Sequence, residues 1–166
     1  MQQISLNRTT KDLLVKYNIR PQKRLGQNFL ISDIALHNII KALDPGPDDT
    51  VIEIGTGLGT ITKEIASRAK HVITIDVDDK VLAAAKDHLK DLNNITFINQ
   101  SILEIDLNTI IVPRITIFGN LPYYISTPII EKLITYYEPG TNPAHIPITN
   151  LVFTLQLEYA KRIVAK

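Results

Sequence analysis

Residues 51–59 constrain the fold most, because they join an apolar strand to a glycine-rich loop and the start of a helix. A short apolar run, 51–54, overlaps the segment Glu53-Ile54-Gly55-Thr56-Gly57-Leu58-Gly59. Glycines permit a tight turn and a close approach of a ligand to the backbone, and a helix start offers unpaired N–H groups. The segment therefore predicts a ligand cradle at the end of a strand, although alone it is also compatible with a purely structural turn.

The rest of the chain repeats this alternation of strand and helix. Apolar runs predict strands at 51–54, 72–75, 95–98, 115–118 and 150–155, and periodic apolar stripes predict helices near 60–68, 78–92 and 127–136 and from 158 onward. Two helices precede them, one over 9–17 capped by Thr9 or Thr10 and one over 33–43 capped by Ser32. Such alternation predicts an α/β fold with a largely parallel sheet covered by helices on both faces.

Length and composition exclude several classes of protein. A chain of 166 residues fits one compact domain, and without cysteine it has neither disulfides nor thiolate metal ligands. The four histidines are too far apart in sequence to suggest a metal site, and no stretch reaches the ~20 apolar residues of a membrane span. We expect a cytoplasmic protein, monomeric, with no metal and no membrane contact.

Charge is unevenly distributed along the chain. Residues 1–24 carry six basic groups and one acidic group, whereas the remainder carries 12 basic and 16 acidic groups. We expect residues 1–22 to form a basic N-terminal arm or helix, with Arg20, Lys23 and Arg24 facing RNA phosphates. A solvated, loosely ordered terminus would have the same composition.

An acidic residue supports a nucleoside-like ligand at the glycine loop. Asp76 ends the next strand, 21 residues after Gly55, where its carboxylate can accept hydrogen bonds from both hydroxyls of a ribose. A dinucleotide fingerprint needs its third glycine or alanine at position 60, where Thr60 stands, and no Gly-Lys-Thr/Ser phosphate loop is present. Asp78 and Asp79 are more simply interpreted as the cap and first-turn charges of the following helix.

A second loop, Gly119-Asn120-Leu121-Pro122-Tyr123-Tyr124, follows the fourth strand. Its residue types suit methyl transfer to an adenine amine: the Asn120 oxygen and the Leu121 carbonyl can accept the amine's hydrogens, and Pro122 stiffens the loop. Tyr123 supplies a flat face for a base swung out of its helix. A proline-stiffened turn flanked by core tyrosines is the structural alternative.

These residues carry a resemblance to a known family. The chain from 23 to 166 is similar to the KsgA/RsmA ribosomal RNA adenine dimethyltransferases, through Arg24-Leu25-Gly26-Gln27-Asn28-Phe29-Leu30, residues 53–59, residues 119–128 and Leu155-Gln156-Leu157-Glu158. The resemblance implies a Rossmann-like class I methyltransferase fold that binds S-adenosylmethionine and forms S-adenosylhomocysteine. It also implies dimethylation of two adjacent adenosines in a hairpin near the 3′ end of 16S ribosomal RNA, with an immature 30S-type particle as partner.

The same resemblance implies roles for individual residues. Asn28 and Leu30 would close over the methionine part of the cofactor above Gly55 and Gly57, and Gln27 would also bind the cofactor. Asp76 would hold the ribose, and Asn120 would touch both cofactor and target amine. Where the family usually has an aspartate that reads the adenine amino group, this chain has Ser101. Serine lacks the charge that strengthens such a contact, so we expect weaker cofactor binding, or a substitute contact from Gln100 or Glu104.

Length is a second departure from the family. Class I methyltransferases have seven strands, whereas five are recognisable here, and the family's helical C-terminal domain has no counterpart before Lys166. We expect a C-terminally truncated chain or a piece of a longer one, with the fifth strand left as a sheet edge.

Two other functions remain open from the sequence. The first is that of the related Erm family, which methylates large-subunit RNA, although Leu121 and Ile125-Ser126-Thr127-Pro128 look more like the ribosome-maturation branch. The second is a non-catalytic RNA-binding assembly factor, which Ser101 favours and the intact 120–123 loop opposes. A DNA adenine or protein glutamine methyltransferase would leave 27–30 unexplained.

Overall fold

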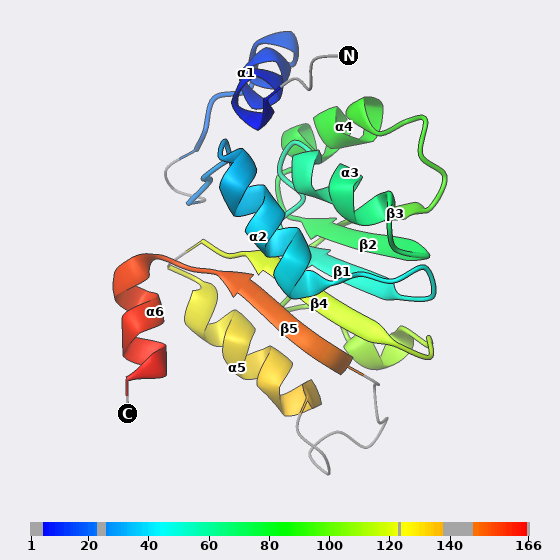
Figure 1. Cartoon of the computed structure of the whole chain (residues 1–166), viewed down its shortest axis with the longest axis vertical. Coiled ribbons are helices and arrows are strands. Elements are labelled where there is room, and N and C mark those ends of the chain that lie inside the picture. Colours follow the sequence, from blue (N-terminus) through cyan, green and yellow to red (C-terminus); the bar gives the residue numbers. More distant parts are fainter. Residues whose placement is uncertain (1–4, 23–25, 123, 138–147, 166) are drawn as a thin grey trace.

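The chain folds around a parallel sheet, as the alternating pattern predicts. A computed structural model describes residues 5–22, 26–122, 124–137 and 148–165. These residues form five parallel strands in the order β3-β2-β1-β4-β5 (Figure 1). The strands are β1 (Thr50–Ile54), β2 (His71–Asp76), β3 (Ile95–Asn99), β4 (Ile115–Asn120) and β5 (Ile148–Thr154). The predicted α/β class and all five strands are therefore confirmed.

Helices cover both faces of the sheet. They are α1 (Leu6–Lys16), α2 (Asp33–Leu43), α3 (Thr60–Ala66), α4 (Asp79–His88), α5 (Ser126–Tyr137) and α6 (Leu157–Val164), with a short 3₁₀ turn, η2 (Leu107–Thr109). Helices α2 and α3 pack on one face of the sheet around Val51, Val72 and Phe118. Helix α5 packs on the opposite face, around Ile52 and Ile117. Alternate residues of one strand thus enter different cores, which is the side-chain period of two expected for a doubly covered sheet.

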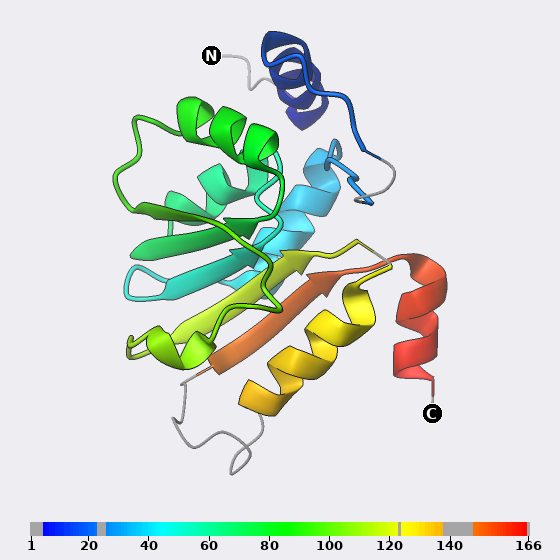
Figure 2. The same cartoon turned by 180° about the vertical axis from the view of Figure 1, so that it is seen from behind.

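Figures 1 and 2 show the consequence for the layers: α2 crosses in front of the strands in one view and lies behind them in the other. Helix α6 lies beyond β5 at the outer side of the molecule in both views, and none of its residues is buried. Within the described ranges β5 pairs with β4 alone, so it forms a sheet edge, as the sequence predicts. The helices of the described chain are all too short or too polar to cross a membrane.

Helix caps confirm two predictions and correct a third. Ser32 caps α2 by accepting from the Ala35 N–H, and Asp78 caps α4 by accepting from Lys80 and Val81. The predicted cap of the first helix at Thr9 or Thr10 is wrong, because the helix begins earlier, with Ser5 as its cap. Both threonine hydroxyls are used elsewhere: Thr9 donates to the Ser5 carbonyl, and Thr10 donates to the Leu30 carbonyl at 3.0 Å.

Helix α1 packs against the body of the fold. Leu13 and Ile19 are buried with Leu58 and Val81, and Lys16 pairs with Asp87 of α4 at 3.0 Å. The predicted N-terminal arm therefore shares a core with the remainder of the chain.

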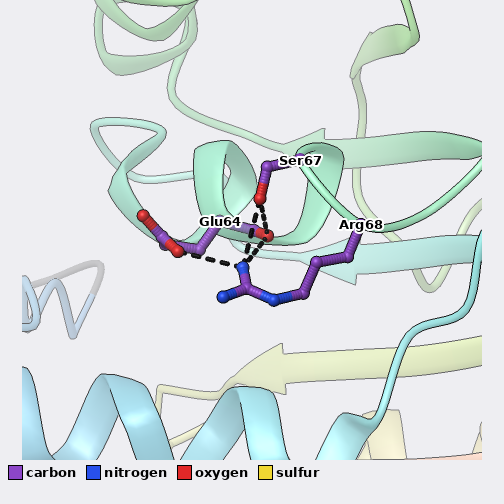
Figure 3. A network of polar contacts seen from close by, with 3 residues as sticks. All are labelled: Glu64, Ser67 and Arg68. Carbon is purple, nitrogen blue, oxygen red and sulfur yellow. Dashed lines mark hydrogen bonds and ion pairs between the residues drawn. The ribbon is translucent and has the colours of Figure 1, made fainter.

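Helix α3, which carries the glycine loop at its start, is closed at its end by an exposed network (Figure 3). The Arg68 Nη1 donates to the Glu64 carbonyl at 2.7 Å, to the Glu64 carboxylate at 3.0 Å and to the Ser67 hydroxyl at 3.1 Å. A cation that satisfies the final carbonyls of a helix complements its dipole, so this short helix has a defined end.

Candidate functional site

A cleft opens at the carboxyl ends of β1, β2, β3 and β4, the usual ligand position in an open parallel sheet. It encloses about 950 Å³ of space free of protein atoms, including the part open to solvent. Its walls combine the glycine loop, the 26–30 loop, the ends of β2 and β3, and the loop after β4. The cleft contains most of the predicted site residues, namely Gln27, Asn28, Leu30, Gly55, Gly57, Asp76, Ser101, Asn120 and Pro122.

The glycine loop lies directly beside the loop after β4. Gly55 and Gly57 have φ values of +87° and +53°, a backbone region that residues with a Cβ rarely adopt. A Cβ on Gly55 would stand 3.7 Å from the Asn120 backbone oxygen, and one on Gly57 would stand 3.5 Å from the Phe29 ring. The two loops that the sequence singled out therefore form one site and line the same cleft.

Beneath the glycine loop lies a buried polar network centred on Glu53. Its carboxylate accepts from the hydroxyls of Thr62 at 2.5 Å and Thr74 at 2.7 Å, and Thr74 in turn contacts the Thr56 hydroxyl at 2.7 Å. Burial raises the pKa of Glu53 to about 7, although the two threonine hydroxyls act in the opposite direction. The network connects β1, β2 and α3 to Thr56 in the glycine loop, so it fixes the floor of the cleft.

Asp76 is held in place by backbone N–H groups. Its carboxylate accepts from Gly57 at 3.1 Å and from Asp78 at 3.0 Å. Burial raises the pKa of Asp76, and these backbone hydrogen bonds counteract part of that shift. Each carboxylate oxygen can accept more than one hydrogen bond, so the group keeps acceptor capacity for ligand hydroxyls.

The 26–30 loop closes the cleft against the loop after β4. The Asn120 Nδ2 donates to the Asn28 carbonyl at 2.9 Å, across 92 positions of sequence. At Gly26 a Cβ would come within 2.7 Å of the Pro122 ring, so this contact requires glycine. Asn28 and Asn120, both assigned to the cofactor by the sequence, therefore lie side by side.

The side chain of Gln27 makes hydrogen bonds within the protein. Its Nε2 donates to Asp78 at 2.7 Å and its Oε1 accepts from the Gln22 N–H at 3.0 Å, so its polar atoms are used in supporting the loop. Gln22 also donates to Asp78, at 2.9 Å. Leu30 lines the cleft but also packs against the core around Ile39 and Phe118. Roles for Gln27 and Leu30 in holding cofactor stay predictions.

Ser101 lines the cleft after β3. Its Oγ accepts from the Leu103 N–H at 3.3 Å, and its carbonyl accepts from Glu104 at 2.9 Å. Serine therefore serves the local turn while its hydroxyl hydrogen remains able to donate toward the cleft. Gln100 lines the same cleft, whereas Glu104 is not among its lining residues.

The loop after β4 is tied down on both sides of Pro122. The buried Leu121 donates its N–H to the Thr154 carbonyl at 3.3 Å, and the Pro122 carbonyl accepts from the Ser126 hydroxyl at 2.8 Å. Tyr124 lines the cleft with 54% of its surface exposed. Tyr123, the predicted stacking platform, lies outside the described residues, as do Lys23 and Arg24; Arg20 is exposed.

Several residues of the site were missed by sequence reasoning. The sequence could have indicated the Glu53 network, because an acidic residue inside an otherwise apolar strand needs buried partners. The roles of Gly26, Phe29 and Thr154 have no such sign, since each depends on a contact between distant segments. No group of three or more potential metal ligands occurs among the residues that the structure describes.

Comparison with known proteins identifies the family. Residues 18–166 match the ribosomal RNA adenine dimethylase family. The "Ribosomal RNA small subunit methyltransferase A" of Clostridium botulinum is 40% identical over 95% of this chain and 55% of its own length. That of Latilactobacillus sakei is 39% identical over 98% and 54%. The chain thus spans about half the length of these curated relatives.

Solved structures show the same relationship. The 23S rRNA methyltransferase ErmE superimposes with a TM-score of 0.67 and 27% identity, over 81% of this chain and 50% of ErmE. A dimethyladenosine transferase from Plasmodium falciparum gives a TM-score of 0.64 and 29% identity, over 81% and 46%. A Rossmann-like methyltransferase fold is thereby established, and the chain belongs to the ribosomal RNA adenine dimethylase family.

Proposed function

We propose that this chain carries the catalytic site of an S-adenosylmethionine-dependent enzyme. Its substrate would be small-subunit ribosomal RNA, in which it dimethylates the exocyclic amines of two adjacent adenosines in a hairpin near the 3′ end. The observation that supports this most is the junction of the two loops, where the Asn120 backbone approaches Gly55 and its side chain bonds to Asn28. This junction makes one cleft from a nucleoside-type cradle and an amine-binding loop.

The residues of the cleft suit the proposed cofactor. Asp76 offers a carboxylate for ribose hydroxyls, Gly55 and Gly57 leave the backbone open to close approach, and Ser101 lies at the end of β3 for the adenine edge. Bound there, S-adenosylmethionine would supply an electrophilic methyl group. The structures of a phosphoethanolamine methyltransferase and of the N-methyltransferase NodS that contain S-adenosylhomocysteine share only the fold at 16% and 21% identity.

The protein's own contribution is positioning. Asn120 Oδ1 and the Leu121 carbonyl would accept the two hydrogens of the target amine, which directs the nitrogen lone pair away from the ring. Pro122 and its bond to Ser126 keep this loop stiff, and Tyr123 would stack on the base. No general base is required, because the proton can leave for water after the methyl group has been transferred.

The proposed choice of RNA is supported by the names and identities of the relatives. Curated proteins that act on the small subunit are 37–40% identical over nearly the whole chain, whereas the ErmE structure is 27% identical. This favours small-subunit RNA in an immature 30S-type particle over the large-subunit alternative. We further propose that exposed Arg20, with Lys23 and Arg24, contacts RNA phosphates, and that the protein acts as a cytoplasmic monomer.

The proposal is tested in two steps. Calorimetry with S-adenosylmethionine measures binding, and immature small subunits and large subunits are then incubated with tritiated cofactor and analysed for methylated adenosine. Heat of binding followed by methyl transfer to small subunits alone is expected. Transfer to large subunits would support the Erm-type function, whereas no heat of binding and no methyl transfer would leave the assembly-factor function.

A further inference from the structure

The residue that ends β5 lies directly beside the proposed amine-binding asparagine. Thr154 pairs with Asn120 in the parallel register of β4 and β5, and its carbonyl accepts from Leu121, the next residue of the loop. The Thr154 hydroxyl donates to the Asn120 Oδ1 at 2.5 Å. One residue of the edge strand therefore contacts both the backbone and the side chain of this loop.

The other end of the Asn120 carboxamide is held as well. Its Nδ2 donates to the Asn28 carbonyl at 2.9 Å. If the carboxamide turned over, its oxygen would face the Asn28 carbonyl oxygen, an acceptor against an acceptor, and its nitrogen would replace the oxygen at Thr154. The Asn28 carbonyl can only accept, so it selects this orientation, and the Thr154 hydroxyl then holds the oxygen end in place from β5.

We propose that Thr154 is a positioning residue that holds the Asn120 carboxamide in the orientation selected by the Asn28 carbonyl, with its oxygen as the available acceptor. This inference rests on the proposed function, because the orientation of the carboxamide matters to methyl transfer only if its oxygen accepts from the target amine. A carboxamide oxygen has two acceptor sites, and the Thr154 hydroxyl uses one of them. The second remains for the amine, whereas a turned carboxamide would present N–H donors to a group that also donates.

Thr154 suits this role without being part of the buried core. It is only partly buried, so the loss of its hydroxyl has a small effect on packing, and valine reproduces its β-branched shape within a strand. Thr149, near the other end of the same strand, also has a hydroxyl bond to β4, at 3.3 Å from the Thr116 hydroxyl. Thr149→Val is therefore a matched control for removing one hydroxyl from β5.

The test compares Thr154→Val, Thr154→Ser and Thr149→Val in the full chain. Nuclear magnetic resonance follows the side-chain ¹³Cγ and Nδ2 signals of Asn120, which are identified by their loss in Asn120→Ala. The expected result is that these signals move in Thr154→Val, return toward wild type in Thr154→Ser and stay unchanged in Thr149→Val. In the methyl-transfer assay, kcat should fall roughly threefold to tenfold in Thr154→Val at constant KM for S-adenosylmethionine.

The outcomes separate this inference from the proposed function. Unmoved Asn120 signals in Thr154→Val would overturn the positioning role, whatever the activity. If the Asn120 signals move in Thr154→Val while kcat stays unchanged, the orientation set by Thr154 is not important for methyl transfer. If the wild-type chain transfers no methyl group to RNA, the proposed function fails, and the signals alone then decide whether Thr154 orients the carboxamide.

Discussion

The two walls of the cleft are built differently. The glycine-loop wall rests on a network of buried groups, with Glu53 and Thr74 both completely buried beneath it. The opposite wall, formed by the loop after β4, is held by hydrogen bonds between part-buried or exposed groups, such as those that join Asn120 to the Thr154 hydroxyl and to the Asn28 carbonyl. In the proposed function this difference corresponds to a division of roles, in which the first wall holds the cofactor and the second receives the RNA.

The largest effect is expected at the second wall. Asn120→Ala removes the proposed acceptor for the target amine, so methyl transfer should fall by a factor on the order of 10²–10³, similar to the loss of one preorganised group in other active sites. S-Adenosylmethionine binding measured by calorimetry should change much less. Loss of binding to the same degree as transfer would assign Asn120 to the cofactor and weaken the contrast between the walls.

Glu53 provides a test of the first wall through pH. Its pKa of about 7 in the folded state exceeds the ordinary 4.5, so the folded state binds more protons between these values. Stability therefore falls as pH rises from about 4.5 to 7, by an amount on the order of 3 kcal/mol. Chemical denaturation at several pH values in this window should show the fall in unfolding free energy in the wild type and a much smaller fall in Glu53→Gln.

A matched control for this prediction is Glu64→Gln on helix α3, where the carboxylate is exposed and paired with Arg68 (Figure 3). This variant should show the same fall in stability between pH 4.5 and 7 as the wild type. Because burial also raises the pKa of Asp76, a residual slope of the same sign is expected in Glu53→Gln. An unchanged slope in that variant would show that Glu53 is not the group responsible.

Asp76 sharpens the comparison by separating binding from transfer. Asp76→Ala removes the acceptor of the Gly57 N–H and the proposed ribose contact, so affinity for S-adenosylmethionine should fall roughly tenfold to a hundredfold. Turnover at saturating cofactor should fall far less than in Asn120→Ala. Asp76→Glu, which keeps the charge, should retain most of the affinity; equal losses in both variants would argue against a charge-assisted contact.

The smallest expected effect is a gain at Ser101. Ser101→Asp introduces a charged acceptor that can accept both the Leu103 N–H and the cofactor's adenine amine, so affinity should rise by about 1 kcal/mol, roughly fivefold. Calorimetry measures this directly. Unchanged affinity would indicate that Gln100, which lines the same part of the cleft, already makes that contact.

Sequence patterns predicted the strands, the caps at Ser32 and Asp78, and the two loops of the site, because each of these depends on neighbouring residues. The start of the first helix is not predictable from the sequence, because Ser5, Thr9 and Thr10 are all potential caps and only the tertiary structure shows that Thr10 bonds to Leu30. The contact of Gln27 with Asp78 spans 51 positions, so no local sequence pattern predicts it.

The sequence by itself determined which segments become strands, helices and ligand-binding loops, since periodicity, glycines and caps act over a few residues. The tertiary structure decided which groups face one another. It joined Asn120 to Asn28 and Thr154, fitted Gly26 against Pro122, and surrounded Glu53 with threonines from two other elements. These contacts exist only because parallel strands place their carboxyl ends at one edge of the sheet, which brings together loops that are distant in the chain.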